Sequence, residues 1–118
     1  MRLHAIVLTP LAIIVALFTL SATTAGAQDA AQIARGQEVY TAQKCQLCHA
    51  VAGKGNKTNP LDGVGKKLSA EDTRAWIVKP AEMTAKAKST KKPPMPGKYG
   101  ALPPADLDAL VAYLQSLK

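Results

Sequence analysis

The sequence predicts a small all-α domain. Two segments begin with helix start signals. Ser69 is followed by acidic residues, and Pro104 lies just ahead of Asp106. No segment alternates apolar and polar residues in the way that a half-buried strand does. The clearest helical pattern is C-terminal, where apolar residues recur with the spacing of one helix face: Leu107, Leu110, Val111, Leu114 and Leu117.

The N-terminus has the features of a signal peptide. Residues 1–4 carry a positive charge, residues 5–20 form an apolar run, and Ala25-Gly26-Ala27 matches a small-residue cleavage site. We therefore expect residues 1–27 to be cleaved, leaving a periplasmic domain of residues 28–118. The alternative is a segment that is retained as a membrane anchor, although its apolar run is short for a membrane span.

The chain is short and basic. It has 118 residues and a net charge of +7, with 15 Lys and Arg against 8 Asp and Glu. A domain of this size buries a modest share of its surface and usually needs added support. With 4% aromatic residues, an exported domain of this kind is a poor candidate for nucleic-acid binding.

The first helix is expected over residues 29–44, with Asp29 as its N-cap. Ile33, Gly36 and Tyr40 fall on one face of this helix. A glycine costs a helix interior about 1 kcal/mol relative to alanine. Gly36 therefore indicates the close approach of a second helix.

The middle of the chain alternates loops and short helices. Glycine, asparagine and proline are dense over residues 52–65, which predicts a loop. A helix that starts at Ser69 should end near Pro80, and residues 81–90 are expected to hold one more short helix. Three prolines among residues 91–97 exclude a helix there.

The segment Cys45-Gln46-Leu47-Cys48-His49 has the spacing of a c-type haem attachment site. Two thiols one helical turn apart can each add across a haem vinyl group and form a thioether. The imidazole that follows can then reach the iron through Nε2 of His49. We expect one haem c, attached through Cys45 and Cys48, which would also supply the support that so short a chain needs.

Three other uses of the cysteines fit less well. Zinc usually takes four ligands, whereas the chain has 2 Cys and 2 His, and His4 lies in the predicted signal peptide. A thioredoxin-like redox pair belongs beside a βαβ pattern, which the sequence does not contain. A structural disulfide would not require a histidine directly after the second cysteine.

From residue 28 to its end, the chain resembles a small bacterial class I cytochrome c. The resemblance implies the cytochrome c fold, in which the N- and C-terminal helices cross beside one covalently bound haem. In that fold Gly36 and Tyr40 would pack against Leu110 and Tyr113. The matching features are, in chain order, Ala34-Arg35-Gly36, Tyr40, the Cys45–His49 motif, Pro60 with its glycine-rich loop, Trp76, Met95-Pro96 and Ala112-Tyr113-Leu114.

The resemblance also implies roles for two residues around the haem. In family members a proline carbonyl accepts a hydrogen bond from the haem-ligating histidine, and by similarity Pro60 does this for His49. One departure is that Leu61 follows Pro60 directly, where many members have an intervening residue. Trp76 resembles the family tryptophan that reaches a haem propionate, and the alternative is an ordinary core tryptophan.

The sixth iron ligand decides the function. The candidates are Met95, Met83, a lysine or an open site. Met95 lies in a proline-rich loop where few conformations compete, and it stands at the family's ligand position. We therefore expect His49 and Met95 to be the two metal ligands. A thioether ligand raises the reduction potential and leaves no vacant site on the iron.

These residues predict an electron carrier rather than an enzyme. We expect a monomer that cycles between Fe(II) and Fe(III) and passes electrons from a donor protein to a terminal oxidase or reductase. The alternatives are a haem subunit of one oxidoreductase complex, and a sensor or peroxidase-like protein with an open sixth site.

Lysines on both sides of the haem motif suggest how redox partners are found. If they surround the haem edge, they would steer the protein to acidic partners in a salt-dependent way. The alternative is an ordinary solvated surface. The lysines concerned are Lys54, Lys57, Lys66, Lys67, Lys86, Lys88, Lys91, Lys92 and Lys98.

Overall fold

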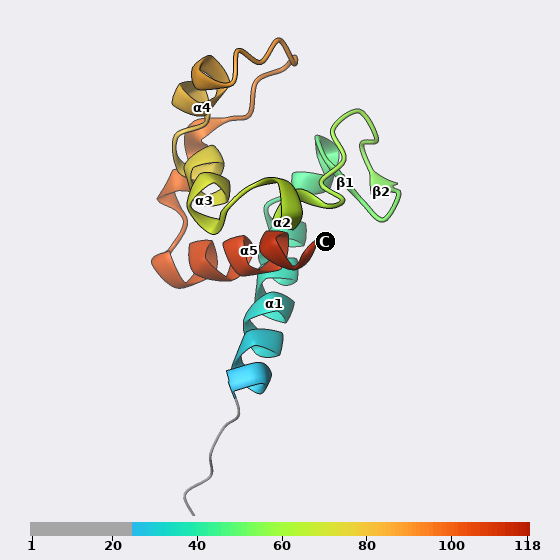
Figure 1. Cartoon of the computed structure of the whole chain (residues 1–118), viewed down its shortest axis with the longest axis vertical. Coiled ribbons are helices and arrows are strands. Elements are labelled where there is room, and N and C mark those ends of the chain that lie inside the picture. Colours follow the sequence, from blue (N-terminus) through green and yellow to red (C-terminus); the bar gives the residue numbers. More distant parts are fainter. Residues whose placement is uncertain (1–24) are drawn as a thin grey trace, which may run out of the picture.

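The computed structural model describes residues 25–118, with side chains from Asp29 onward. The described chain is mostly helical, which confirms the predicted all-α class. Nearly all of the predicted signal peptide lies outside the described residues. The elements are α1 (Ala25–Ala42), η1 (Cys45–Leu47), β1 (Ala50–Val51), β2 (Lys54–Gly55), α2 (Val64–Lys67), α3 (Ala70–Val78), α4 (Pro80–Lys86), η2 (Gly97–Ala101) and α5 (Pro104–Ser116) (Figure 1).

The first and last helices cross at Gly36, as predicted. α5 lies across α1 in Figure 1, and no side chain separates the two backbones at Gly36. A Cβ built on Gly36 would lie 2.6 Å from Tyr113 Cβ and would also meet the Ala109 carbonyl. One turn further along, the Tyr40 and Tyr113 rings meet edge to face with centroids 5.6 Å apart. Leu110 belongs to the same buried cluster.

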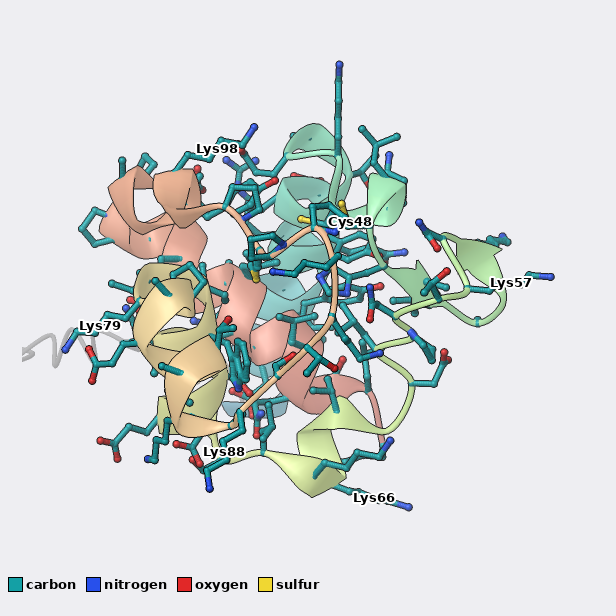
Figure 2. All side chains as sticks on the ribbon, turned by 90° about the horizontal axis from the view of Figure 1, so that it is seen from above. Cys48, Lys57, Lys66, Lys79, Lys88 and Lys98 are labelled. Carbon is teal, nitrogen blue, oxygen red and sulfur yellow. The ribbon has the colours of Figure 1, made fainter. Side chains whose placement is uncertain are left out.

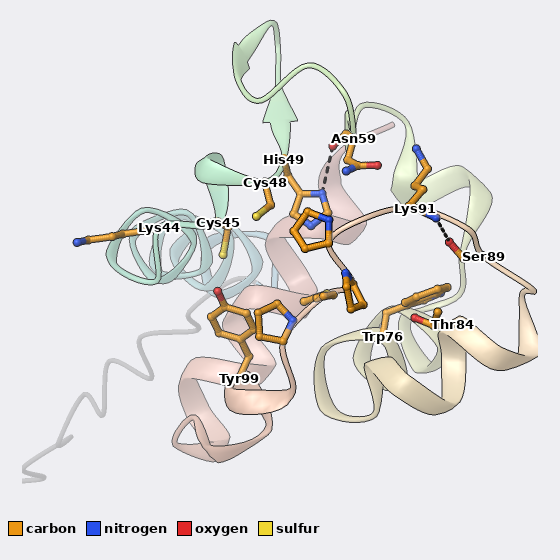
Figure 3. Close-up of a pocket in the computed structure, with 14 residues that line it drawn as sticks. Lys44, Cys45, Cys48, His49, Asn59, Trp76, Thr84, Ser89, Lys91 and Tyr99 are labelled. Carbon is orange, nitrogen blue, oxygen red and sulfur yellow. Dashed lines mark hydrogen bonds between the residues drawn. The ribbon is translucent and has the colours of Figure 1, made fainter.

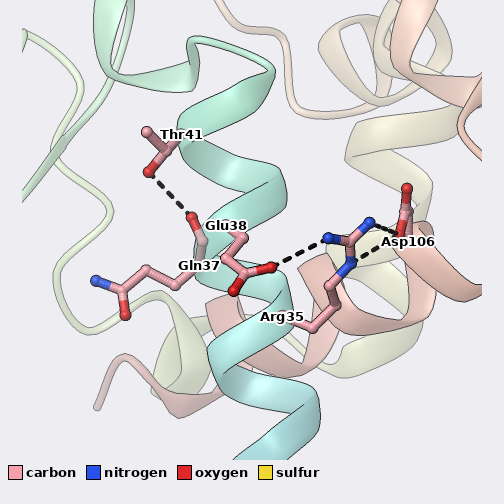
Figure 4. Close-up of polar contacts among 5 residues, drawn as sticks. All are labelled: Arg35, Gln37, Glu38, Thr41 and Asp106. Carbon is pink, nitrogen blue, oxygen red and sulfur yellow. Dashed lines mark hydrogen bonds and ion pairs between the residues drawn. The ribbon is translucent and has the colours of Figure 1, made fainter.

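An exposed ion-pair network joins the same two helices. Arg35 donates from Nε and one Nη atom to Asp106 at 3.1 Å and 2.9 Å, and its other Nη atom donates to Glu38 at 3.0 Å (Figure 4). These hydrogen bonds, that to Asp106 above all, raise the pKa of the Arg35 guanidinium. Exposed pairs of this kind contribute little stability. The crossing itself therefore holds the helices together.

The start of α1 differs from the prediction. α1 begins at Ala25, so Asp29 lies inside the helix and is not its N-cap. The residues ahead of Asp29 are rich in alanine, the best helix former, and they extend the helix by one turn. The helix ends at Ala42, and Lys44 turns the chain with a φ of 57°.

α3 begins at the predicted cap and is tied to α5. The Ser69 hydroxyl accepts a hydrogen bond from the Asp72 N–H at 3.0 Å. The Gln115 side chain in α5 donates to the hydroxyl of Thr73 at 2.8 Å and to the Leu68 carbonyl at 3.1 Å. Thr73 is buried at 3% exposure, so this amide satisfies a polar group that water cannot reach.

Prolines delimit the next elements as the sequence predicts. α3 ends at Val78, and α4 starts at Pro80, which occupies the first turn of the new helix. Residues 88–96 contain no helix before η2 begins at Gly97. In residues 25–118, no helix combines the length and apolar character needed to cross a membrane.

A short hairpin that the sequence did not predict follows the haem motif. β1 and β2 pair antiparallel, with Ala50 opposite Gly55. Strands of two residues are too short to show any alternation of side chains. Gly55 has a φ of +105° and lies directly over η1, because a Cβ there would come within 3.0 Å of the Gln46 carbonyl. The hairpin therefore packs against η1 and supports the haem motif.

Candidate haem site

Two adjoining cavities of about 150 Å³ and 200 Å³ lie between α1, α3 and the loop before η2. Five residues line both cavities: Cys45, His49, Trp76, Met95 and Tyr99. The second cavity, here called the inner one because core side chains line it, is otherwise bordered by residues that are almost all apolar: Tyr40, Leu61, Val64, Leu68, Thr73, Ile77, Leu110 and Leu114. The outer cavity is covered by the loop that contains Met95 (Figure 3).

The two thiols lie on one tight turn beside these cavities. The 3₁₀ turn η1 is closed by hydrogen bonds to the Cys45 carbonyl from the N–H groups of Cys48 at 3.1 Å and His49 at 2.9 Å. Both cysteines are free, with Cys45 half-buried and Cys48 exposed. Burial raises the pKa of the Cys45 thiol to about 11. Both thiols line the outer cavity, as two attachment points for one group require.

His49 is oriented by a backbone carbonyl. Its Nδ1–H donates to the Asn59 carbonyl at 3.1 Å, which leaves the Nε2 lone pair available to a metal ion. Burial lowers the pKa of His49, the charge of Lys91 lowers it further, and the hydrogen bond to Asn59 opposes both. The imidazole is thus held in the neutral, ligating tautomer.

The acceptor is Asn59, so the expected role of Pro60 is wrong. The Asn59 carbonyl also accepts the Ala50 N–H at 3.3 Å, and the Leu61 N–H donates back to Ala50 at 2.8 Å. Leu61 lines the inner cavity. In many family members one residue separates this proline from the residue that corresponds to Leu61, whereas here Leu61 follows Pro60 directly. With Leu61 in the cavity, the residue that lies where the family proline would lie is therefore Asn59. The carbonyl that reaches His49 is then that of Asn59.

Met95 and Trp76 both reach the site. Met95 is half-buried in a loop flanked by prolines and lines both cavities, whereas Met83 lies on α4 and lines neither. Trp76 comes from α3 and also lines both cavities. Pro60 lines neither of them. The structure therefore brings Cys45, Cys48, His49, Trp76 and Met95 together and leaves Pro60 outside.

Sequence reasoning missed two residues of the site, Asn59 and Tyr99. Asn59 had no signal of its own beyond standing next to Pro60. Tyr99 follows the methionine loop, and nothing in its local pattern distinguishes it from a surface tyrosine. Burial raises the pKa of the Tyr99 hydroxyl, and Lys98 Nζ lies 5.2 Å from its ring centroid. Lys91, one of the lysines expected around the haem edge, is exposed and also lines the outer cavity.

The donor set fits a haem. It comprises two thiols, one imidazole with a free Nε2 and one thioether, against apolar walls. Among residues 25–118, no group of three or more His, Cys, Asp or Glu side chains could hold a metal ion by itself. An isolated zinc site therefore has no support in the described chain, whereas a macrocycle that brings its own iron would fill the cavities.

The fold and this site define an all-α protein whose cavities fit a haem. The chain belongs to the cytochrome c family, because the family model described as Cytochrome c matches residues 33–118. It is thus a haem-binding electron-transfer protein. No curated protein and no solved structure is similar enough to the chain to count as a match.

Proposed function

We propose that this protein is a periplasmic mono-haem electron carrier, not an enzyme, with His49 and Met95 as the axial ligands of its iron. The observation that carries the proposal is that both side chains line both cavities together with Cys45, and that Cys48 also lines the outer one. A thioether ligand raises the reduction potential and closes the iron to small ligands. When bound, the haem supplies the one-electron Fe(II)/Fe(III) couple.

The residues of the chain act by holding and shielding this group. Cys45 and Cys48 fix it covalently on a rigid turn. The Asn59 carbonyl keeps His49 in one tautomer, so the ligand needs no rearrangement between oxidation states. The apolar side chains of the inner cavity keep water from the buried face, which limits solvent reorganisation during electron transfer.

The surface supports docking to acidic redox partners. In the view from above, Lys57, Lys66, Lys88 and Lys98 lie around the rim of the face that carries Cys48 (Figure 2). In the described part of the chain, the ion pairs involve only three cations: Arg35, Arg74 and Lys79. The remaining lysines leave positive charge free to steer a negatively charged partner.

Export follows from the N-terminal pattern. We propose that residues 1–27 direct the chain to the periplasm and are removed there. The cleavage point after Ala27 falls in the first turn of α1, ahead of the residues that cross α5. Sequencing the N-terminus of the protein purified from its native cells tests this, because a retained leader would instead support a membrane anchor.

The optical spectrum of the oxidised protein tests the ligand pair. We expect a methionine–Fe(III) charge-transfer band that disappears in Met95→Ala and survives in Met83→Ala. Reduced Met95→Ala should bind carbon monoxide rapidly, whereas the unmodified protein should not. If the unmodified protein binds carbon monoxide as fast as Met95→Ala, the site is open and the carrier proposal fails.

A further inference from the structure

The outer cavity has two chemically different ends. Cys45 and Cys48 lie on one side of it, together with Lys44 and Tyr99 (Figure 3). On the other side, beyond His49, lie side chains that carry hydrogen-bond donors: Asn59, Trp76, Thr84, Ser89 and Lys91. These residues come from the loop before α2, from α3 and α4, and from the segment after α4. The fold thus gathers donors opposite the thiols.

This polar end is positively charged and lacks a carboxylate. No Asp or Glu lines either cavity, whereas Lys91 lines the outer one. Lys91 Nζ donates to the Thr58 carbonyl at 3.4 Å, and Lys91 forms no ion pair within residues 25–118.

The cofactor implied by the proposed function has the same two-ended chemistry. A haem carries its vinyl groups on one side of the macrocycle and two propionate carboxylates on the other. If the vinyl groups are bonded to Cys45 and Cys48, the carboxylates are directed to the polar end. We infer that Lys91 is a positioning residue at this end, and that its charge pairs with a haem propionate.

Two consequences follow for the reduction potential. A cation beside the haem disfavours Fe(III), so removing the Lys91 charge should lower the potential. A nearby cation also lowers the pKa of a carboxyl group. Without the Lys91 charge, the pKa of the propionate should be higher. Deprotonation of the propionate lowers the reduction potential, so this fall in potential should occur at higher pH in a variant that lacks the charge. The titratable groups that line the same cavity are Lys44, Cys45, Cys48, His49 and Tyr99.

The experiment compares potential against pH for the haem-loaded protein and three variants. Lys91→Gln removes the charge, Lys91→Arg keeps it, and Lys92→Gln removes an equal charge from the next residue, which lines neither cavity. At pH 8, Lys91→Gln should shift the Fe(II)/Fe(III) ratio about threefold toward Fe(III), which corresponds to about 28 mV for one electron. Lys92→Gln should shift it much less, and Lys91→Arg should restore the original curve.

The outcomes separate this inference from the function on which it rests. Equal shifts in Lys91→Gln and Lys92→Gln would show only a general surface charge effect and would overturn the inference. An unchanged pH dependence in Lys91→Gln would overturn it as well. In both cases the covalent haem and the methionine band would remain, so the proposed electron carrier would stand. If the unmodified protein did not show the methionine band, the proposed function would be refuted instead.

Discussion

The helix crossing that supports the site can be tested by replacing Gly36 with alanine. A Cβ at this position would lie 2.6 Å from Tyr113 Cβ and would also meet the Ala109 carbonyl. Non-bonded carbon atoms prefer a separation of about 3.5–4.0 Å. The obstacles are backbone and Cβ atoms, so no change of rotamer can relieve the clash. The two helices would have to move apart by roughly 1 Å.

The expected cost follows from two opposing effects. Adding a methyl group to a well-packed contact typically costs about 1–3 kcal/mol. Because the clash is with backbone, we place Gly36→Ala at the upper end, about 3 kcal/mol. Alanine regains about 1 kcal/mol of helix propensity. The net loss of unfolding free energy is therefore about 2 kcal/mol.

Urea unfolding of the haem-loaded protein, followed by far-ultraviolet circular dichroism, measures this loss. For a small protein with a urea slope of about 1–3 kcal/mol/M, the midpoint should fall by about 1 M. The matched control is Gly97→Ala, because a Cβ at Gly97 would meet no atom within 4 Å. A midpoint for Gly36→Ala that equals or exceeds that of the unmodified protein would refute the reasoning.

Three further predictions concern attachment, pH and salt. Cys45→Ala combined with Cys48→Ala should leave no haem on the chain in denaturing electrophoresis with a haem stain, and a stained band would contradict covalent attachment. Burial raises the pKa of Tyr40 from 10.0 to about 12, so its contribution to stability is full below pH 10 and is lost as the pH rises through 12. Tyr40→Phe should therefore lose less stability than the unmodified protein over that interval in urea unfolding, and parallel curves would argue against it. The rate of electron transfer to the natural oxidase should fall steeply with added salt, and a flat response would eliminate docking through lysines.

Local patterns were sufficient where a structure depends on near neighbours in the chain. The Ser69 cap, the break at Pro80 and the apolar stripe of α5 all depend on residues within a few positions of each other. Gly36 was informative for a similar reason, because a glycine inside a helix needs an explanation. Local patterns failed at Asp29, where alanine-rich chain continued the helix past a good cap residue.

The surroundings of the haem site depended on contacts between distant segments. Asn59 replaced Pro60 as the partner of His49 because Leu61 lies in the inner cavity, and the direct succession of Pro60 and Leu61 was the sign of that shift in the sequence. The hairpin of β1 and β2 could not be predicted from local patterns either, because its contact with η1 stabilises it.

Sequence alone was enough to establish that the chain is helical and that Cys45, Cys48 and His49 have the spacing of a haem attachment motif. Both are short-range properties, since capping, helical periodicity and thiol spacing operate within a few residues. The groups that surround the cavity were established by the folded structure and not by any local pattern. Loop closure set the carbonyl that orients His49, and the return of the chain after α4 placed Lys91 opposite the thiols. Such placements depend on how separate segments share one buried space, and that space exists only in the folded chain.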